Sequence, residues 1–171
     1  WVELTDNCLQ NGKALHFIGL LSDGNVHSNI SHLIAMLKKA REMGLKKVYC
    51  HILLDGRDVP ATSALEYVDQ LEAVLASLSD AEHEYKIASG GGRMVITMDR
   101  YGANWDMVRK GWEVHVHGCG EMFRNAHEAV EALRKKTGAI DQDLPPFVIS
   151  DDGKTPVGAM KDHDSVIYFN F

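Results

Sequence analysis

Short apolar runs alternate with amphipathic stretches along most of the chain. Residues 14–21 and 46–54 are such runs, rich in β-branched and aliphatic side chains, and we expect each to be a strand buried on both faces. After each run, apolar residues recur every three or four positions, which predicts helices over 30–43 and 64–78, the second beginning after Ser63. The order strand, loop, helix therefore occurs twice.

The second half of the chain carries shorter signals. Residues 85–89 predict a third strand that runs into Gly90, Gly91 and Gly92, whose lack of Cβ atoms either lets backbone N–H groups approach a ligand or only adds flexibility. We expect a short helix over 105–110 ended by Gly111, and a strand over 113–117. The remaining pattern predicts a helix over 123–136 and strands over 147–149 and 166–171.

Strands separated by amphipathic helices pair in parallel through right-handed crossovers. The fold class is therefore α/β, with three αβα layers around a mostly parallel sheet. Residues 1–171 contain neither an internal repeat nor an obvious linker, so we expect a single domain.

Composition and charge narrow the classes of partner. The 171 residues carry a formal net charge of −6, which argues against a general nucleic-acid or anionic-membrane surface. No run approaches the roughly 20 apolar residues of a membrane span, and the first residues do not resemble a signal peptide. Cys8, Cys50 and Cys119 are far apart and lack CxxC spacing, which favours a reducing, cytoplasmic compartment.

Both ends of the chain look like those of a fragment. It begins with Trp1 rather than Met, and it ends on 165–171, which is typical of a strand cut off near its end. The sequence gives no direct evidence of an oligomeric state, and our expectation is a monomer.

Charged residues follow the three predicted strands. The loops pair Asp23 with His27, Asp55 with Arg57 and Asp58, and Arg93 with Arg100. In a parallel sheet these loops share the carboxyl edge, where ligands of open α/β sheets bind. Arginines bind phosphate or carboxylate through paired hydrogen bonds, and an aspartate among them can orient a substrate hydroxyl or accept its proton.

Structural explanations compete with this one. Arg57 and Asp58 also fit a surface ion pair, or a cap of the helix that follows, and a lone His27 is more often a loop or capping residue. His115, His117 and Cys119 include the side chains that bind zinc. His115 and His117 would share one face of the predicted strand with Cys119 beyond them, but no fourth ligand is indicated nearby. We favour a structural role for these three.

Four motifs in chain order resemble those of the cofactor-independent phosphoglycerate mutases. They are Leu20–Ser28, Asp55–Pro60, Gly91–Arg93 followed by Met98–Tyr101, and Val166–Phe171. Asn25 stands where the family commonly has Gly, and the interval from Arg93 to Arg100 is slightly stretched. The match covers most of the chain from about Gly19, and it corresponds to the phosphotransferase domain, which is inserted into an alkaline-phosphatase-like domain in that family.

The resemblance implies the chemistry. A complete enzyme would interconvert 3-phosphoglycerate and 2-phosphoglycerate through a phosphoserine, in glycolysis and gluconeogenesis. In this chain His27, Arg57, Arg93 and Arg100 would hold phosphate and carboxylate, while Asp58 would orient glycerate and act as its acid or base. The nucleophilic serine and two metal ions, usually manganese, would lie in the phosphatase domain, whose motifs are absent from these residues, so we expect no cofactor or metal in this fragment and no activity from it alone. The alternative is a stand-alone module that binds a small phosphorylated metabolite.

Overall fold

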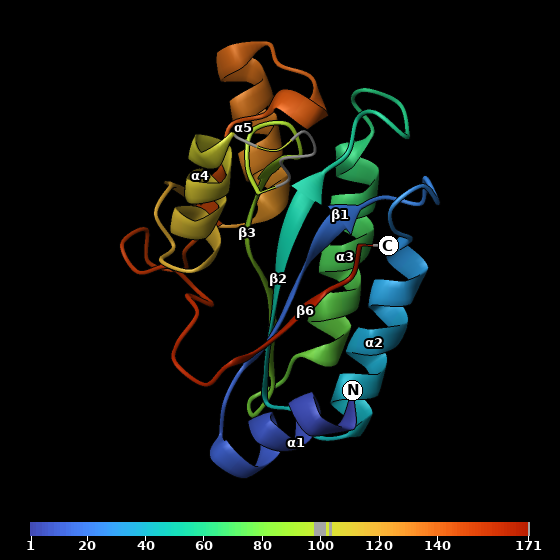
Figure 1. The fold of residues 1–171 in the computed structure, drawn as a ribbon, viewed down its shortest axis with the longest axis vertical. Coiled ribbons are helices and arrows are strands. Elements are labelled where there is room, and N and C mark those ends of the chain that lie inside the picture. The colour runs from blue at the N-terminus through green and yellow to red at the C-terminus, as the bar shows by residue number, and fades with distance from the viewer. Residues whose placement is uncertain (98–101, 103, 171) are drawn as a thin grey trace.

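The computed structural model describes residues 1–97, 102 and 104–170, which form one mixed sheet with helices on both faces (Figure 1). The elements are, in chain order, α1 (Val2–Asn11), β1 (Leu15–Leu21), α2 (Ile30–Glu42), β2 (Lys47–Leu54), α3 (Ala64–Leu78), β3 (Glu84–Gly92), α4 (Trp105–His115), β4 (Glu121–Phe123), α5 (Ala126–Thr137), a 3₁₀ turn (Asp141–Asp143), β5 (Phe147–Ile149) and β6 (Ser165–Tyr168). None of the helices in the described part of the chain is both long and apolar enough to cross a bilayer.

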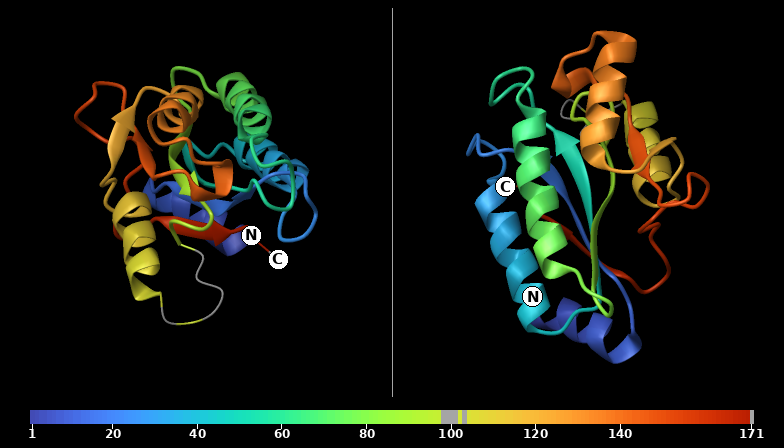
Figure 2. Two further views of the ribbon diagram at one scale, coloured as in Figure 1. Left: turned by 90° about the horizontal axis from the view of Figure 1, so that it is seen from above. Right: turned by 180° about the vertical axis from the view of Figure 1, so that it is seen from behind.

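The sheet has the strand order β4-β5-β3-β2-β1-β6. All neighbouring pairs are parallel except β3 and β5, so the predicted three-layer α/β class with a mostly parallel sheet is confirmed. Helices α2, α3 and α5 cover one face, and α4 lies on the other (Figure 2). The main core fills the space under α2, α3 and α5, where Phe17, Leu33 and Leu71 are fully buried.

The three glycines lie inside β3, which is longer than the sequence suggested. A Cβ added at Gly90 would meet the ring of Phe147 at 2.5 Å, and one at Gly91 would meet Ile96 at 2.9 Å. At Gly92 it would collide with the carbonyl of Gln142. Neither alternative considered for these glycines, approach of a ligand or added flexibility, describes them, because they lie in a strand and protein already fills the space beside them.

The region around Gly111 also differs from the prediction. Residues 113–117 do not form a strand, because α4 continues through Gly111 to His115. Gly111 is buried against Thr97, and any side chain there would collide with it. The glycine thus serves close packing rather than helix termination. The helix predicted from residue 123 begins at Ala126, since 121–123 form β4 and Asn125 caps the helix by accepting from the N–H of Glu128.

Candidate functional site

The carboxyl ends of β1, β2 and β3 lie side by side at the upper edge of the sheet in Figure 1. The strand register pairs Leu21 with Leu54, and Leu54 with Gly92. The first residues beyond these paired ends are therefore neighbours: Ser22, Asp55 and Arg93. Two elements of the predicted site, the Asp55 loop and Arg93, meet here as the strand-end argument requires.

Arg93 links the loops. Its side chain is 7% exposed, and Nη1 lies 2.7 Å from Oδ1 of Asp55 and 2.5 Å from Oδ2 of Asp58. Both contacts use Nη1, so Nη2 and Nε of the guanidinium have no partner among the described residues. Two carboxylates around the cation raise the pKa of Arg93 above its usual value against the opposing effect of burial. The side chain is permanently charged and held in one place.

Asp55 is a buried anchor rather than a ligand-facing group. Its Oδ2 accepts from the hydroxyl of Ser22 at 2.6 Å, and its Oδ1 accepts from the backbone N–H groups of Arg57 and Asp58. Burial raises the pKa of Asp55, but these hydrogen bonds and the one from Arg93 outweigh it and hold the pKa below its ordinary value. Asp55 therefore shapes the turn that presents residues 57 and 58.

Asp58 and Arg57 are presented differently by that turn. The Asp58 side chain is 15% exposed beside Arg93, which makes it reachable and oriented. Arg57 is exposed, and its Nη1 lies 4.0 Å from the sulfur of Met94, so it projects over the edge of the sheet. The alternative that these two residues form an ion pair with each other does not hold in this structure, because the partner of Asp58 is Arg93.

His27 lies in the loop between β1 and α2. That loop contacts the Asp58 turn closely, since a Cβ at Gly24 would lie 3.0 Å from the Cβ of Asp58. His27 itself is half-buried and bonds to none of the other predicted site residues in the described part of the chain. Asn25 has φ 60°, a left-handed conformation that Asn tolerates better than other non-glycine residues. Its presence where the family has Gly therefore leaves the loop geometry intact.

Tyr67 supports the same loop from α3. Its hydroxyl donates to Oδ1 of Asp23 at 2.6 Å, and burial together with that carboxylate raises the pKa of Tyr67 to about 12. The sequence placed Asp23 in the same loop as His27 but gave no indication of Tyr67 or Ser22. Ser22 could have been identified from its position, since it follows the first predicted strand directly as Asp55 follows the second. No local feature of the sequence indicates Tyr67. Arg100 lies outside the described residues.

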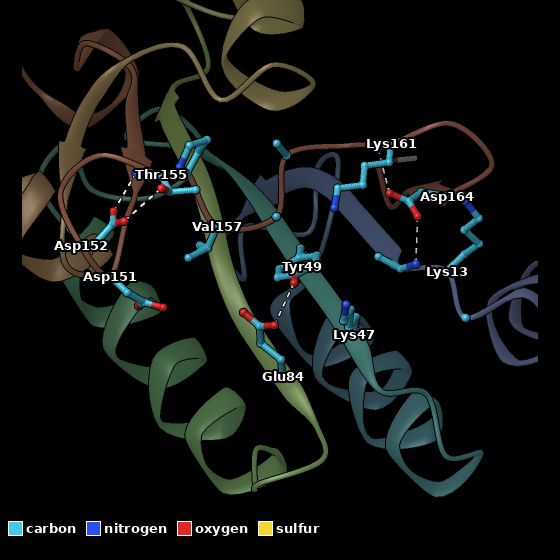
Figure 3. Close-up of a pocket in the computed structure, with 15 residues that line it drawn as sticks. Lys13, Lys47, Tyr49, Glu84, Asp151, Asp152, Thr155, Val157, Lys161 and Asp164 are labelled. Atoms are coloured by element: carbon cyan, nitrogen blue, oxygen red, sulfur yellow. Dashed lines mark hydrogen bonds between the residues drawn. The ribbon is translucent and has the colours of Figure 1, made fainter.

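A cavity of about 640 Å³ opens at the opposite edge of the sheet, at the amino ends of the strands (Figure 3). Its walls carry both lysines and carboxylates, several of which already have partners within the protein: the Tyr49 hydroxyl donates to Glu84, and Asp164 accepts from the N–H groups of Ala14 and Lys161. None of the predicted site residues lines it. The carboxyl edge is therefore the better candidate.

A chain of buried polar side chains crosses the face of the sheet that carries α4. Asp164 lies 3.3 Å from Nε2 of His16, whose Nδ1 lies 3.0 Å from Nε2 of His51. Beyond His51 the chain continues through Ser89 at 2.7 Å. Because a carboxylate accepts, His16 donates to it from Nε2, and His51 must then donate to Nδ1 of His16.

The same logic fixes the rest of the chain. Ser89 donates to His51, accepts from Nδ1 of His115 at 2.8 Å, and leaves Nε2 of His115 to accept from Thr97 at 2.8 Å. Burial lowers the pKa of His115 to about 4, and it lowers the pKa of His16 and of His51 as well. All three imidazoles are therefore neutral in the folded protein near pH 7.

This arrangement bears on the zinc alternative. Both ring nitrogens of His115 have protein partners, and His117 accepts from the indole of Trp112 at 3.1 Å. Within residues 1–97, 102 and 104–170, no three His, Cys, Asp or Glu side chains gather as metal ligands would. The shared face on which the zinc alternative depended does not exist, because His115 belongs to a helix.

Comparison with known proteins decides the family. The model of the family described as BPG-independent PGAM N-terminus matches residues 1–171. The chain belongs to this family. Its relatives in the BPG-independent PGAM family include a probable 2,3-bisphosphoglycerate-independent phosphoglycerate mutase of Leptospira interrogans, 52% identical over all of this chain and 31% of the relative. The corresponding mutase of Trypanosoma brucei is 47% identical over 95% of this chain and 30% of its own length.

A solved structure agrees with this assignment. A crystal structure of Leishmania mexicana phosphoglycerate mutase at low cobalt concentration superposes with a TM-score of 0.89 and 38% sequence identity. The match covers 99% of this chain and 34% of that protein. This BPG-independent PGAM chain thus spans about a third of the length of the relatives it matches.

Proposed function

We propose that this chain is the glycerate-binding half of a phosphoglycerate mutase, and that the longer polypeptide interconverts 3-phosphoglycerate and 2-phosphoglycerate through a phosphoserine. The observation that carries the proposal is the contact of Asp58 with Arg93 at the edge where three parallel strands end. It brings together a carboxylate and a fixed cation from two of the loops whose sequences resemble the family. The family of the chain and the activity named for its relatives agree with it.

Each residue has a separate role in the proposed reaction. Arg57 is exposed and grips the phosphate or carboxylate of the substrate, with His27 and Arg100 as further groups for the same anions. Arg93 offers Nη2 and Nε to the substrate while Nη1 orients Asp58. Asp58 positions the glycerate hydroxyls, accepts the proton of the hydroxyl that takes up the phosphoryl group, and returns a proton to the one that loses it.

The remaining parts of the mechanism belong to the rest of the polypeptide. We propose that the serine nucleophile and two divalent metal ions, manganese by family resemblance, lie there; the described residues offer no group of ligands that fits such ions. The isolated fragment would then bind phosphoglycerate weakly and be inactive. The proposal also retains a monomeric, cytoplasmic enzyme with no nucleic-acid or membrane partner.

Steady-state kinetics of the full-length protein test the proposal. Asp58→Asn should lower kcat by about 10²–10⁴-fold, because it removes the general acid and base, whereas Arg57→Ala should mainly raise KM. Asp106→Asn, on the exposed start of α4, is the matched control and should leave both constants near their wild-type values. A wild-type protein without mutase activity, or an Asp58→Asn variant with normal kcat, would contradict the proposal.

A further inference from the structure

A groove of about 590 Å³ runs between α4 and the edge strand β6. Val108 and Trp112 form its α4 wall, Val166 and Tyr168 form its β6 wall, and Ile18 of β1 lines it between them. It lies on the face of the sheet opposite α2, α3 and α5. In Figure 2, left, α4 is the helix on that side of the sheet.

Large aromatic side chains around this groove are exposed. Trp112 is 59% exposed and Tyr168 62%, and both line the groove. Trp112 is nevertheless fixed, because its indole N–H donates to His117 and the two rings meet edge to face. Contiguous exposed apolar surface with ordered aromatic groups is typical of a surface that another segment covers.

The layering of the fold indicates what kind of segment is missing. A sheet in an α/β protein is covered by helices on both faces, because both faces are apolar. Here α4 is the one described helix on its side, and among the strands it packs mainly against β3. The part of the sheet formed by β1 and β6 therefore lacks its helix on this face.

The handedness of the connections indicates where such a helix would come from. Helices α2 and α3 connect parallel strands that step from β1 through β2 to β3, and both lie on the same face. Helix α5 connects β4 to β5, which run antiparallel to β1, β2 and β3, and the step from β4 to β5 is opposite to the step from β1 to β2. Because both directions are reversed, a crossover of the same hand places its helix on the same face as α2 and α3, as observed. The three connections share one hand, as parallel crossovers do.

The face that a crossover helix reaches depends on the direction of the strands and on the direction of the step across the sheet, and a continuation beyond β6 reverses only the step. β6 is parallel to β1 but lies on its other side, so a step outward from β6 runs opposite to the step from β1 to β2. A crossover of the same hand then places its helix on the opposite face, which is the face with the groove. Because Tyr168 at the end of β6 already lines the groove, no long connection is needed.

We propose that the groove between α4 and β6 is the docking site of an amphipathic helix formed by the segment that follows residue 171 in the full-length polypeptide. The inference rests on the proposed function only in that the chain is part of a longer mutase, about a third of which it spans. The helix would place apolar residues three and four apart against Val108, Trp112 and Tyr168.

Photo-crosslinking of the full-length protein tests the docking. Benzoylphenylalanine replaces Trp112, and in a matched control it replaces Lys135, which is exposed on α5 across the sheet. Mass spectrometry after illumination should find an intramolecular crosslink from position 112 to a peptide that follows residue 171, and none of this kind from position 135. Crosslinks to a second copy, to a segment preceding residue 1, or to no peptide at all would overturn the inference.

A second variant keeps the test independent of the photo-probe. Trp112→Lys in the full-length protein should lower the urea midpoint of unfolding more than Trp112→Leu does if a helix covers the groove, because only the lysine buries an unpaired charge. Both variants lose the contact with His117, so equal midpoints would show that the groove is open. Mutase activity of the wild-type protein separates the two proposals. An active enzyme without the crosslink overturns the docking alone, and a crosslinked protein without activity overturns the proposed function alone.

Discussion

Nη1 of Arg93 lies 2.5 Å from Oδ2 of Asp58, so the cation that follows β3 orients the carboxylate that follows β2. Because the same nitrogen also bonds to the buried Asp55, the two loops are fixed together before any ligand binds. The contact therefore connects stability and the proposed function at one atom, and the two can be measured separately.

Replacing Arg93 should unfold the protein more easily than replacing its exposed neighbour. Arg93→Ala leaves the buried carboxylate of Asp55 without its cation, and we expect a loss of about 3 kcal/mol in the free energy of unfolding. Arg57→Ala should change that free energy by less than about 0.5 kcal/mol. Urea titrations of both variants check this, and equal losses would show that the Arg93 contacts are not formed in solution.

Tyr67→Phe should loosen the loop that carries His27. The change removes the hydroxyl that donates to Asp23 while keeping the ring, so we expect a loss of about 1 kcal/mol in stability. Hydrogen exchange of the amides in residues 23–28 should become faster. Tyr168→Phe, at an exposed position, is the control, and equal exchange rates in wild type and Tyr67→Phe would contradict the role assigned to the hydroxyl.

Gly92→Ala should be strongly destabilising, by about 2 kcal/mol or more, because the added methyl group collides with the backbone of residues 142–144. Gly12→Asn serves as the comparison. Gly12 has φ 63° but open space around it, and Asn accepts that conformation at the end of α1, so we expect less than about 1 kcal/mol. Thermal unfolding of the two variants measures the difference, and a tolerated Gly92→Ala would mean that β3 and the 142–144 segment are further apart.

The buried histidines predict a characteristic dependence of stability on pH. The pKa values of His16, His51 and His115 are lowered in the folded state, so below about pH 6.5 the unfolded chain binds protons that the folded chain does not. Stability is then full above this pH and falls as the pH drops toward about 4, with a slope of up to about 4 kcal/mol per pH unit for three protons.

Denaturant titrations between pH 4 and pH 8 measure this slope. The exposed His127 provides the contrast, because its bond to Asp69 raises its pKa and so gives the opposite sign. His127→Gln should therefore leave the decline at acid pH in place. A stability that is flat between pH 5 and pH 7 would show that the three imidazoles are not buried together.

The sequence was sufficient for β1, α2, β2 and α3, and insufficient for α1 and for parts of the second half. Continuous apolar runs identified β1 and β2, which are buried on both faces, and the period of three to four residues identified α2 and α3 closely. Helix α4 was misread at Gly111, since a glycine that ends a helix and one that lets Thr97 approach look identical in sequence.

The candidate site was predictable to a similar degree. The rule that loops meet at strand ends brought Asp58 and Arg93 together correctly, but the anchoring roles of Ser22 and Tyr67 depend on register and on a helix distant in sequence. Nor could spacing show that Arg93 is buried while Arg57 is exposed. Arg100 remains a prediction.

The side chains around Arg93 also determine the local net charge at this edge of the sheet. The charges of Asp55 and Asp58 equal and oppose those of Arg57 and Arg93, so the four side chains together carry no net charge. A quartet without net charge attracts a distant anion only weakly, although Arg57 can still bind one at close range. Under the proposed function, this edge of the sheet would therefore hold a substrate that has already arrived, and long-range attraction would have to come from cations elsewhere in the full-length polypeptide.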